Sequence, residues 1–69
     1  MKIGEAAKLI ASDELFVSQQ YALVAVYATA LRNKVRGLLG REPTDSEFAL
    51  ATDFLEERLK VVNIERSAS

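Results

Sequence analysis

Apolar residues recur along this chain at the three- and four-residue steps of an α-helix. The clearest series lies within residues 13–39 and consists of Val17, Tyr21, Val24, Ala28, Leu31, Val35 and Leu38. Its spacing is that of the a and d positions in a helix bundle. A second series, rotated around the same helix, consists of Phe16, Gln20, Leu23, Tyr27 and Ala30. We therefore predict one long helix over 13–39 that has two faces to bury.

The strongest interruption of this pattern is a turn that begins at Gly40. Glycine adopts the left-handed conformation that ends many helices, and Pro43 cannot continue one. Thr44 and Glu47 then have the spacing of a capping box, in which each side chain accepts a hydrogen bond from the backbone amide of the other residue. One helix is predicted to end before this turn and another to begin after it.

The second helix is predicted over 44–62, and the short connection makes it the antiparallel hairpin partner of the first. One of its faces carries Phe48, Ala51, Leu55, Leu59 and Val62, and an adjoining face carries Leu50, Phe54 and Val61. A shorter helix is predicted over 2–11, where Ile3, Ala6, Ala7 and Ile10 recur at helical spacing. About ten residues are marginal as an isolated helix, so this one needs a surface to lie on. The polar residues 63–69 are predicted to fray.

The resulting all-α chain of 69 residues is long enough for one domain, 1–69, with a small core. A core of this size rarely supplies more than about 3 to 5 kcal/mol, and the sequence has no cysteine or histidine for a disulfide or a zinc site. Both hairpin helices also carry more apolar surface than one partner covers. We expect two hairpins to form a homodimeric four-helix bundle. The alternative is a monomer whose first helix folds over the hairpin.

The residue types needed for most enzymatic chemistry are missing. Without histidine or cysteine, the commonest general base and all thiolate chemistry are absent. Asp53, Glu56 and Glu57 could pair as carboxylates, but a solvated acidic face is the simpler interpretation. No glycine-rich phosphate loop is present in the sequence. We therefore predict no catalytic residue, no cofactor and no metal ligand.

Charge is nearly balanced over the whole chain but is segregated along it. The net charge is −1 and the pI about 5.3, so no global field attracts nucleic acid or an anionic membrane. A basic cluster consists of Arg32, Lys34, Arg36 and Arg41, and five acidic residues follow within 45–57. Such charges can offset the helix dipoles, or the arginines can form a cationic rim that binds an acidic partner or phosphate.

Tyr27 is the other candidate for binding a partner, because tyrosine and arginine dominate interface energetics once they are desolvated. It would form a patch with Ala30 and Lys34 if that face of the helix is open, and it is a core residue if the face is covered. The candidate partner-binding residues are therefore Tyr27, Arg32, Lys34, Arg36 and Arg41.

No feature of the sequence indicates a membrane protein. The first residues lack the basic segment and long apolar run of a signal peptide, and the most apolar stretch, 21–31, is about half the length that spans a bilayer. We expect a cytoplasmic protein.

Two short segments resemble parts of bacterial transcription proteins. Residues 39–47, Leu-Gly-Arg-Glu-Pro-Thr-Asp-Ser-Glu, are similar to the segment that opens region 3 of primary-type sigma factors. Residues 1–8, Met-Lys-Ile-Gly-Glu-Ala-Ala-Lys, look like the opening of MerR-type regulators. In size and architecture, the whole chain resembles the small phage-encoded inhibitors of bacterial regulators, including the dimeric quorum-sensing anti-activator type.

That last resemblance implies a homodimer that inhibits a transcription regulator by covering its functional surface. We expect a protein–protein interaction module of this kind. One alternative is a nucleic-acid-binding regulator that uses the local basic patch, and binding of that kind would weaken steeply with salt. Another is a structural subunit that assembles into larger species by itself.

Overall fold

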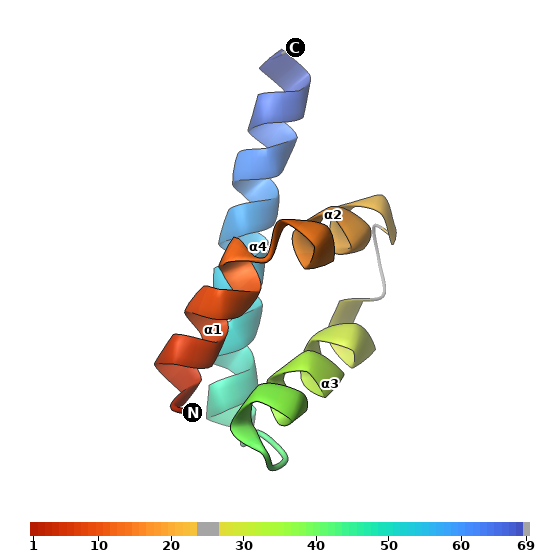
Figure 1. The fold of residues 1–69 in the computed structure, drawn as a ribbon. Coiled ribbons are helices and arrows are strands. Elements are labelled where there is room, and N and C mark those ends of the chain that lie inside the picture. Colours follow the sequence, from red (N-terminus) through yellow and green to blue (C-terminus); the bar gives the residue numbers. More distant parts are fainter. Residues whose placement is uncertain (24–26, 69) are drawn as a thin grey trace.

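The computed structural model describes residues 1–23 and 27–68, and all regular structure within them is α-helical. The helices are α1 (Ile3–Ser12), α2 (Glu14–Leu23), α3 (Tyr27–Leu39) and α4 (Asp45–Ala68) (Figure 1). The predicted all-α class is confirmed for these residues. None of the four helices combines the length and apolar composition that crossing a bilayer requires.

The first helix lies along the proximal part of α4, and both run in the same direction in Figure 1. Ala6, Ala7 and Ile10 form its buried face, with exposed fractions of 1% or less. Alanine at two of these positions lets the helix backbones approach closely. The short helix therefore has the supporting surface that its length requires, and it covers part of α4 within a single chain.

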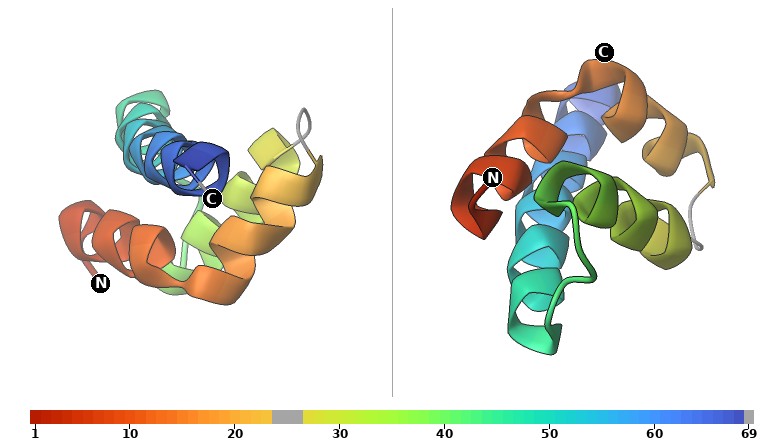
Figure 2. Two further views of the ribbon diagram at one scale, coloured as in Figure 1. Left: turned by 90° about the horizontal axis from the view of Figure 1, so that it is seen from above. Right: turned by 60° about the horizontal axis from the view of Figure 1, so that its bottom comes forward.

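A sharp corner separates α1 from α2. Asp13 has an extended conformation there, with φ −80° and ψ 94°. Its carboxylate accepts a hydrogen bond of 3.1 Å from the backbone amide of Phe16, which caps the first turn of α2. From above, α1 and α2 together form an L that borders α3 and α4 (Figure 2).

The prediction of one continuous helix over 13–39 is wrong, because two helices with different directions, α2 and α3, occupy this range (Figure 1). In a straight helix, Val17 and Leu31 would lie about 21 Å apart along the helix axis and could not share one small core. Folding back lets Val17 from α2 and Leu31 from α3 pack in the same cluster.

That cluster is the hydrophobic core, and its buried members are Ile10, Phe16, Val17, Leu31, Val35, Ala51 and Leu55. Tyr27, Leu38 and Phe48 are partly buried against it, and Tyr21 is half-buried. Ala28, predicted on the same apolar seam, is exposed in the single chain. The change of direction between α2 and α3 explains this, because the seam no longer faces one side. Val24 and the side chain of Leu23 lie outside the described residues.

The turn between α3 and α4 has the predicted chemistry. Gly40 takes the left-handed conformation, with φ 77°. The Thr44 amide donates to the Glu47 carboxylate at 2.9 Å, and the Glu47 amide donates to the Thr44 hydroxyl at 3.2 Å. This capping box begins α4, which then runs back from the turn past α3 (Figure 1).

The prediction that residues 63–69 fray is also wrong for the described part, because α4 continues to Ala68. Two contacts with α2 support this extension. The Tyr21 hydroxyl donates to the Asn63 side chain at 3.1 Å, and the Arg66 guanidinium lies 4.5 Å from the centre of the Tyr21 ring. The distal end of α4, residues 61–68, projects beyond all other helices (Figure 1).

Candidate functional site

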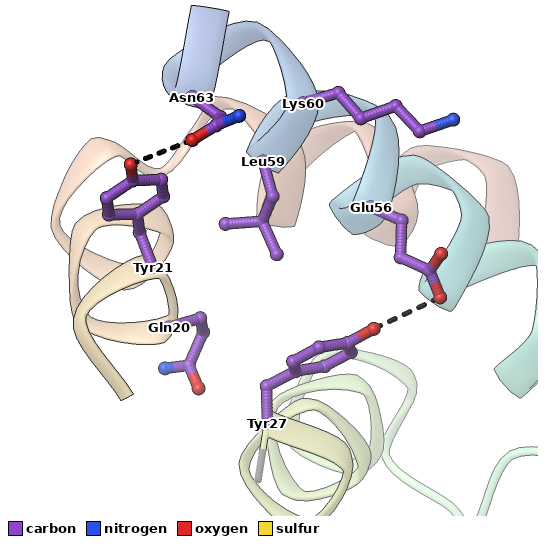
Figure 3. A pocket seen from close by; sticks show the side chains of 7 residues that line it. All are labelled: Gln20, Tyr21, Tyr27, Glu56, Leu59, Lys60 and Asn63. Atoms are coloured by element: carbon purple, nitrogen blue, oxygen red, sulfur yellow. Dashed lines mark hydrogen bonds between the residues drawn. The ribbon is translucent and has the colours of Figure 1, made fainter. Parts of the chain in front are cut away.

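A hollow of about 440 Å³ opens between α2, α3 and α4 (Figure 3). This volume lies within the range of small-molecule binding sites. The described residues that line it are Gln20, Tyr21, Tyr27, Glu56, Leu59, Lys60 and Asn63. Because three different helices supply them, the hollow depends on the tertiary fold and has no counterpart in a continuous sequence motif.

Two tyrosines form opposite sides of the hollow, and each is tied to α4. Tyr21 from α2 donates to Asn63, and Tyr27 from α3 donates to the Glu56 carboxylate at 3.0 Å. Burial raises the pKa of Tyr27 above its usual value of 10.0. The hydrogen bond to Glu56 and the negative charge of Glu56 raise this pKa further. The hydroxyl therefore remains protonated at neutral pH and acts as a donor. Both rings are held in place by these bonds.

In Figure 3, Leu59 points between the two rings and Gln20 lies below Tyr21, and only 4% of Gln20 is exposed. Among the residues that the structure describes, no donor lies within hydrogen-bonding distance of its side-chain oxygen Oε1. Leaving a buried acceptor unpaired costs about 1 to 3 kcal/mol. Such groups are uncommon in folded proteins, and this oxygen marks a polar position within the otherwise apolar packing of α2.

Tyr27 does not form the predicted open patch with Ala30 and Lys34. Ala30 packs against the core, and the Lys34 ammonium lies 3.2 Å from the Asp13 carboxylate at the corner between α1 and α2. The same ammonium lies 5.5 Å from the centre of the Phe16 ring. The hydrogen bond from the Phe16 amide lowers the pKa of Asp13 below its usual value of 3.8, and the contact with the Lys34 ammonium lowers it further. Lys34 therefore joins α3 to this corner.

Arg32 and Arg36 do lie together, on either side of one carboxylate. Glu42 is 3.7 Å from the Arg32 guanidinium and 2.9 Å from that of Arg36. Arg36 also donates to the Asn33 side chain at 2.7 Å, and the Arg32 guanidinium lies 4.3 Å from the centre of the Phe48 ring. These arginines secure the end of α3 to the turn and to α4.

Arg41 makes the closest ion pair of the basic cluster. Its guanidinium donates two hydrogen bonds of 2.7 Å to the two carboxylate oxygens of Glu47. The hydrogen bonds from Arg41 have the largest effect on the pKa of Glu47, and the hydrogen bond from the Thr44 amide has the second largest. Together they lower this pKa from its usual 4.5 to about 2. The predicted cationic rim is therefore divided among three acidic partners, which are Asp13, Glu42 and Glu47.

The hollow is the feature that the sequence analysis missed. One signal was present, because Gln20 interrupts an otherwise apolar series on the long predicted helix. Nothing in the spacing showed that Glu56 and Asn63 would meet the two tyrosines, since the prediction of a continuous helix placed Tyr21 and Tyr27 along one rod.

In the part of the chain that the structure describes, no three acidic residues are grouped so that they could hold a metal ion. Comparison with known proteins found no match among family models, curated proteins or solved structures.

Proposed function

We propose that this chain is a homodimeric helical interaction module that binds another protein and modulates it by covering its functional surface. A transcription regulator is the kind of partner that we favour, from the resemblance in size and architecture to small phage-encoded inhibitors. The observation that carries the proposal is the apolar surface left on the distal end of α4. Val61 is 43% exposed and Ile64 is 66% exposed on a helix segment that projects from the fold.

A second copy of the chain is the simplest cover for this segment. Val61 and Ile64 are three residues apart, so they lie on neighbouring positions of one helix face. A two-fold axis beside that face would pair each distal end with its copy. This arrangement replaces the predicted pairing of two hairpins, because α1 already covers the proximal part of α4 within the chain.

Further apolar side chains remain for a protein partner. Leu15 is 71% exposed on the side of α2 that faces away from the core, and Leu9 is 48% exposed on α1. Protein interfaces combine such apolar contacts with a polar rim. Arg32 and Arg36, whose side chains are 40% and 51% exposed, are our candidates for charged rim residues.

The ion pairs count against the alternative of binding nucleic acid. Phosphate contacts would have to displace Asp13, Glu42 or Glu47 from the cations that they already neutralise. Titration with duplex DNA at low salt tests this directly. We expect no saturable binding. Tight binding that weakens steeply with added salt would favour the alternative function of nucleic-acid binding.

The dimer is tested by light scattering on the wild type and two matched variants. Ile64→Asp and Ser67→Asp each add one negative charge to the distal end of α4, but only the first removes an apolar side chain. We expect the wild type and Ser67→Asp at about twice the chain mass of 7.6 kDa and Ile64→Asp at the monomer mass with its helicity kept. A wild type that is monomeric at micromolar concentration would contradict the dimer.

The partner is sought by affinity capture from a bacterial lysate, and its binding is then measured with the purified protein. Leu15→Asp should weaken binding by about tenfold or more, which corresponds to about 1.4 kcal/mol. Gln19→Asp, at an exposed polar position of the same helix, is the control. Equal loss in both variants would show an effect of charge and not of an apolar contact at Leu15.

A further inference from the structure

A second hollow, of about 420 Å³, opens between the corner of α1 and α2 and residues 54–58 of α4. The described residues that line it are Lys8, Ala11, Ser12, Glu14, Phe54 and Arg58. We propose that it binds an acidic segment of the protein partner, in which an aspartate or glutamate lies beside an apolar side chain. The inference rests on the proposed function, because it names the chemistry of the partner segment that this chain contacts.

The carboxylate is indicated by two cations without an acidic partner. Each residue of the basic cluster forms an ion pair within the chain. In contrast, no ion pair joins Lys8 or Arg58 to a carboxylate of the described residues. A carboxylate accepts two parallel hydrogen bonds from a guanidinium, and the charges make these bonds stronger than neutral ones. Arg58 is half-buried at the wall of the hollow, where an ion pair is worth more than on an open surface.

The apolar neighbour is indicated by Phe54. This side chain is half-buried at the hollow, but it belongs neither to the hydrophobic core nor to the residues packed against it. A cation lies over each of the rings of Phe16 and Phe48, whereas among the described residues none lies over Phe54. Leu15, which is 71% exposed, directly follows the lining residue Glu14. An apolar side chain of the partner can therefore contact a free aromatic ring beside the two cations.

The charge of the hollow favours a single carboxylate over a chain of phosphates. Two cations, Lys8 and Arg58, and one acid, Glu14, give the lining a net charge of +1, which one carboxylate balances. Repeated phosphates would be repelled by Glu14, and the net charge of −1 on the whole chain provides no wider positive field to offset this. A phosphate backbone also offers little apolar surface to Phe54.

The test uses the isolated wild-type chain and two blocked tripeptides. The probes are acetyl-Leu-Glu-Leu-amide and acetyl-Leu-Gln-Leu-amide, which have nearly the same shape but differ by one carboxylate. In a ¹⁵N NMR titration, the reporters at the hollow are the backbone amides of Ala11 and Ser12 and the Nε–H group of Arg58. We expect the glutamate peptide to shift these signals and to bind at least about fivefold more tightly than the glutamine peptide, as one charge-assisted hydrogen bond requires.

Two pairs of matched variants locate the binding. Arg58→Gln and Lys60→Gln each remove one positive charge from α4, but only Arg58 lines this hollow. Lys8→Gln and Lys2→Gln make the same change in the N-terminal segment, where only Lys8 lines it. We expect Arg58→Gln to lose the preference for the glutamate peptide, Lys8→Gln to reduce it, and the two controls to keep it. The backbone amides of Ala11 and Ser12 report in all four variants.

Acetate and inorganic phosphate are the remaining probes. Acetate has the carboxylate without the apolar side chains, so we expect it to bind at least about fivefold more weakly than the glutamate peptide. The inference is overturned if neither peptide shifts the reporters, if the two peptides bind equally, or if acetate or phosphate binds as tightly as the glutamate peptide. The comparison of probes on the wild type decides even if Arg58→Gln fails to fold.

These outcomes are separate from those that test the proposed function. If the peptides do not bind but Leu15→Asp weakens binding of the captured partner, the proposed function stands and this hollow is not the contact. If the glutamate peptide binds as expected but Leu15→Asp has no effect, the hollow binds acidic segments and the contact at Leu15 is wrong.

Discussion

The two ends of α4 both carry apolar residues but differ in their surroundings. The proximal part is capped by Thr44 and Glu47, and it is packed by α1 and α3 so that Ala51 and Leu55 are fully buried. The distal end carries apolar residues as well, but Val61 and Ile64 are exposed there. Apolar residues therefore mark helix faces that need cover. The fold of one chain buries them fully in the proximal part, whereas in the distal end it partly covers Val62 and leaves Val61 and Ile64 exposed.

The largest expected effect comes from placing the same charge at each end. Leu55→Asp puts an unpaired carboxylate into a site with 0% exposure, at a cost of several kcal/mol that matches the whole stability of a small domain. We expect helical circular dichroism to be lost in Leu55→Asp and kept in Ile64→Asp. If both variants unfold, the distal end is as essential as the core and the contrast between the ends is wrong.

The next effect concerns the cap. Thr44→Ala removes the hydroxyl that accepts a hydrogen bond from the Glu47 amide. This substitution should lower the free energy of unfolding by about 0.5 to 2 kcal/mol. Ser67→Ala near the other end should change it by less than about 0.5 kcal/mol. Urea denaturation of both variants measures the difference. Equal losses would show that the capping box does not anchor α4.

A pH dependence should follow from Glu47. Its pKa is about 2 in the folded chain and 4.5 as an ordinary glutamate, so the folded state binds this proton more weakly than the unfolded state. The stabilisation is complete above about pH 4.5 and is lost as the pH falls towards 2. The midpoint of thermal unfolding should therefore fall more steeply in this window for the wild type than for Glu47→Gln. Parallel curves would contradict the role of the Arg41 pair.

Glu57→Gln is the control for that experiment. Glu57 lies on the same helix, and its contact with Lys60 is a longer, exposed ion pair of 3.8 Å. We expect its curve to follow the wild type.

The smallest effect concerns the tie between α2 and the distal end. Tyr21→Phe removes the exposed hydrogen bond to Asn63 and should cost less than about 1 kcal/mol globally. The change should be concentrated in residues 61–68, whose amide hydrogens should exchange faster while those around Leu55 keep their rates. Uniform acceleration along α4 would show that the two ends unfold as one unit.

The sequence predicts the features that depend on local chemistry. Gly40, Thr44 and Glu47 lie within eight residues, and the turn and cap that they form need no distant partner. The all-α class follows in the same way from periodicity. The change of direction between α2 and α3 was not predictable, because the apolar spacing of Val17 and Leu31 fits both a straight helix and two helices that share one core.

The candidate site depends on that change of direction. Tyr21 and Tyr27 approach α4 from separate helices, and sequence spacing alone does not bring Gln20 near Glu56. The pairing of Arg32 and Arg36 with Glu42 was equally hidden, since the segregation of charge along the chain shows only that opposite charges are available. The sequence therefore identified the charged groups, and the tertiary fold decided which carboxylate each one meets.

The packing of α1 along α4 has a consequence for synthesis on the ribosome. Residues 1–12 are synthesised before α4, the helix against which Ala6, Ala7 and Ile10 are buried. At 5 to 20 residues per second, about 3 to 11 s separate the two events. A helix of this length is marginal in isolation, so the segment of α1 lacks its supporting surface during this interval and keeps its apolar residues exposed. The core shared by α1 and α4 can close only after α4 has been made, and slow translation lengthens the time in which chaperones or proteases can bind this segment.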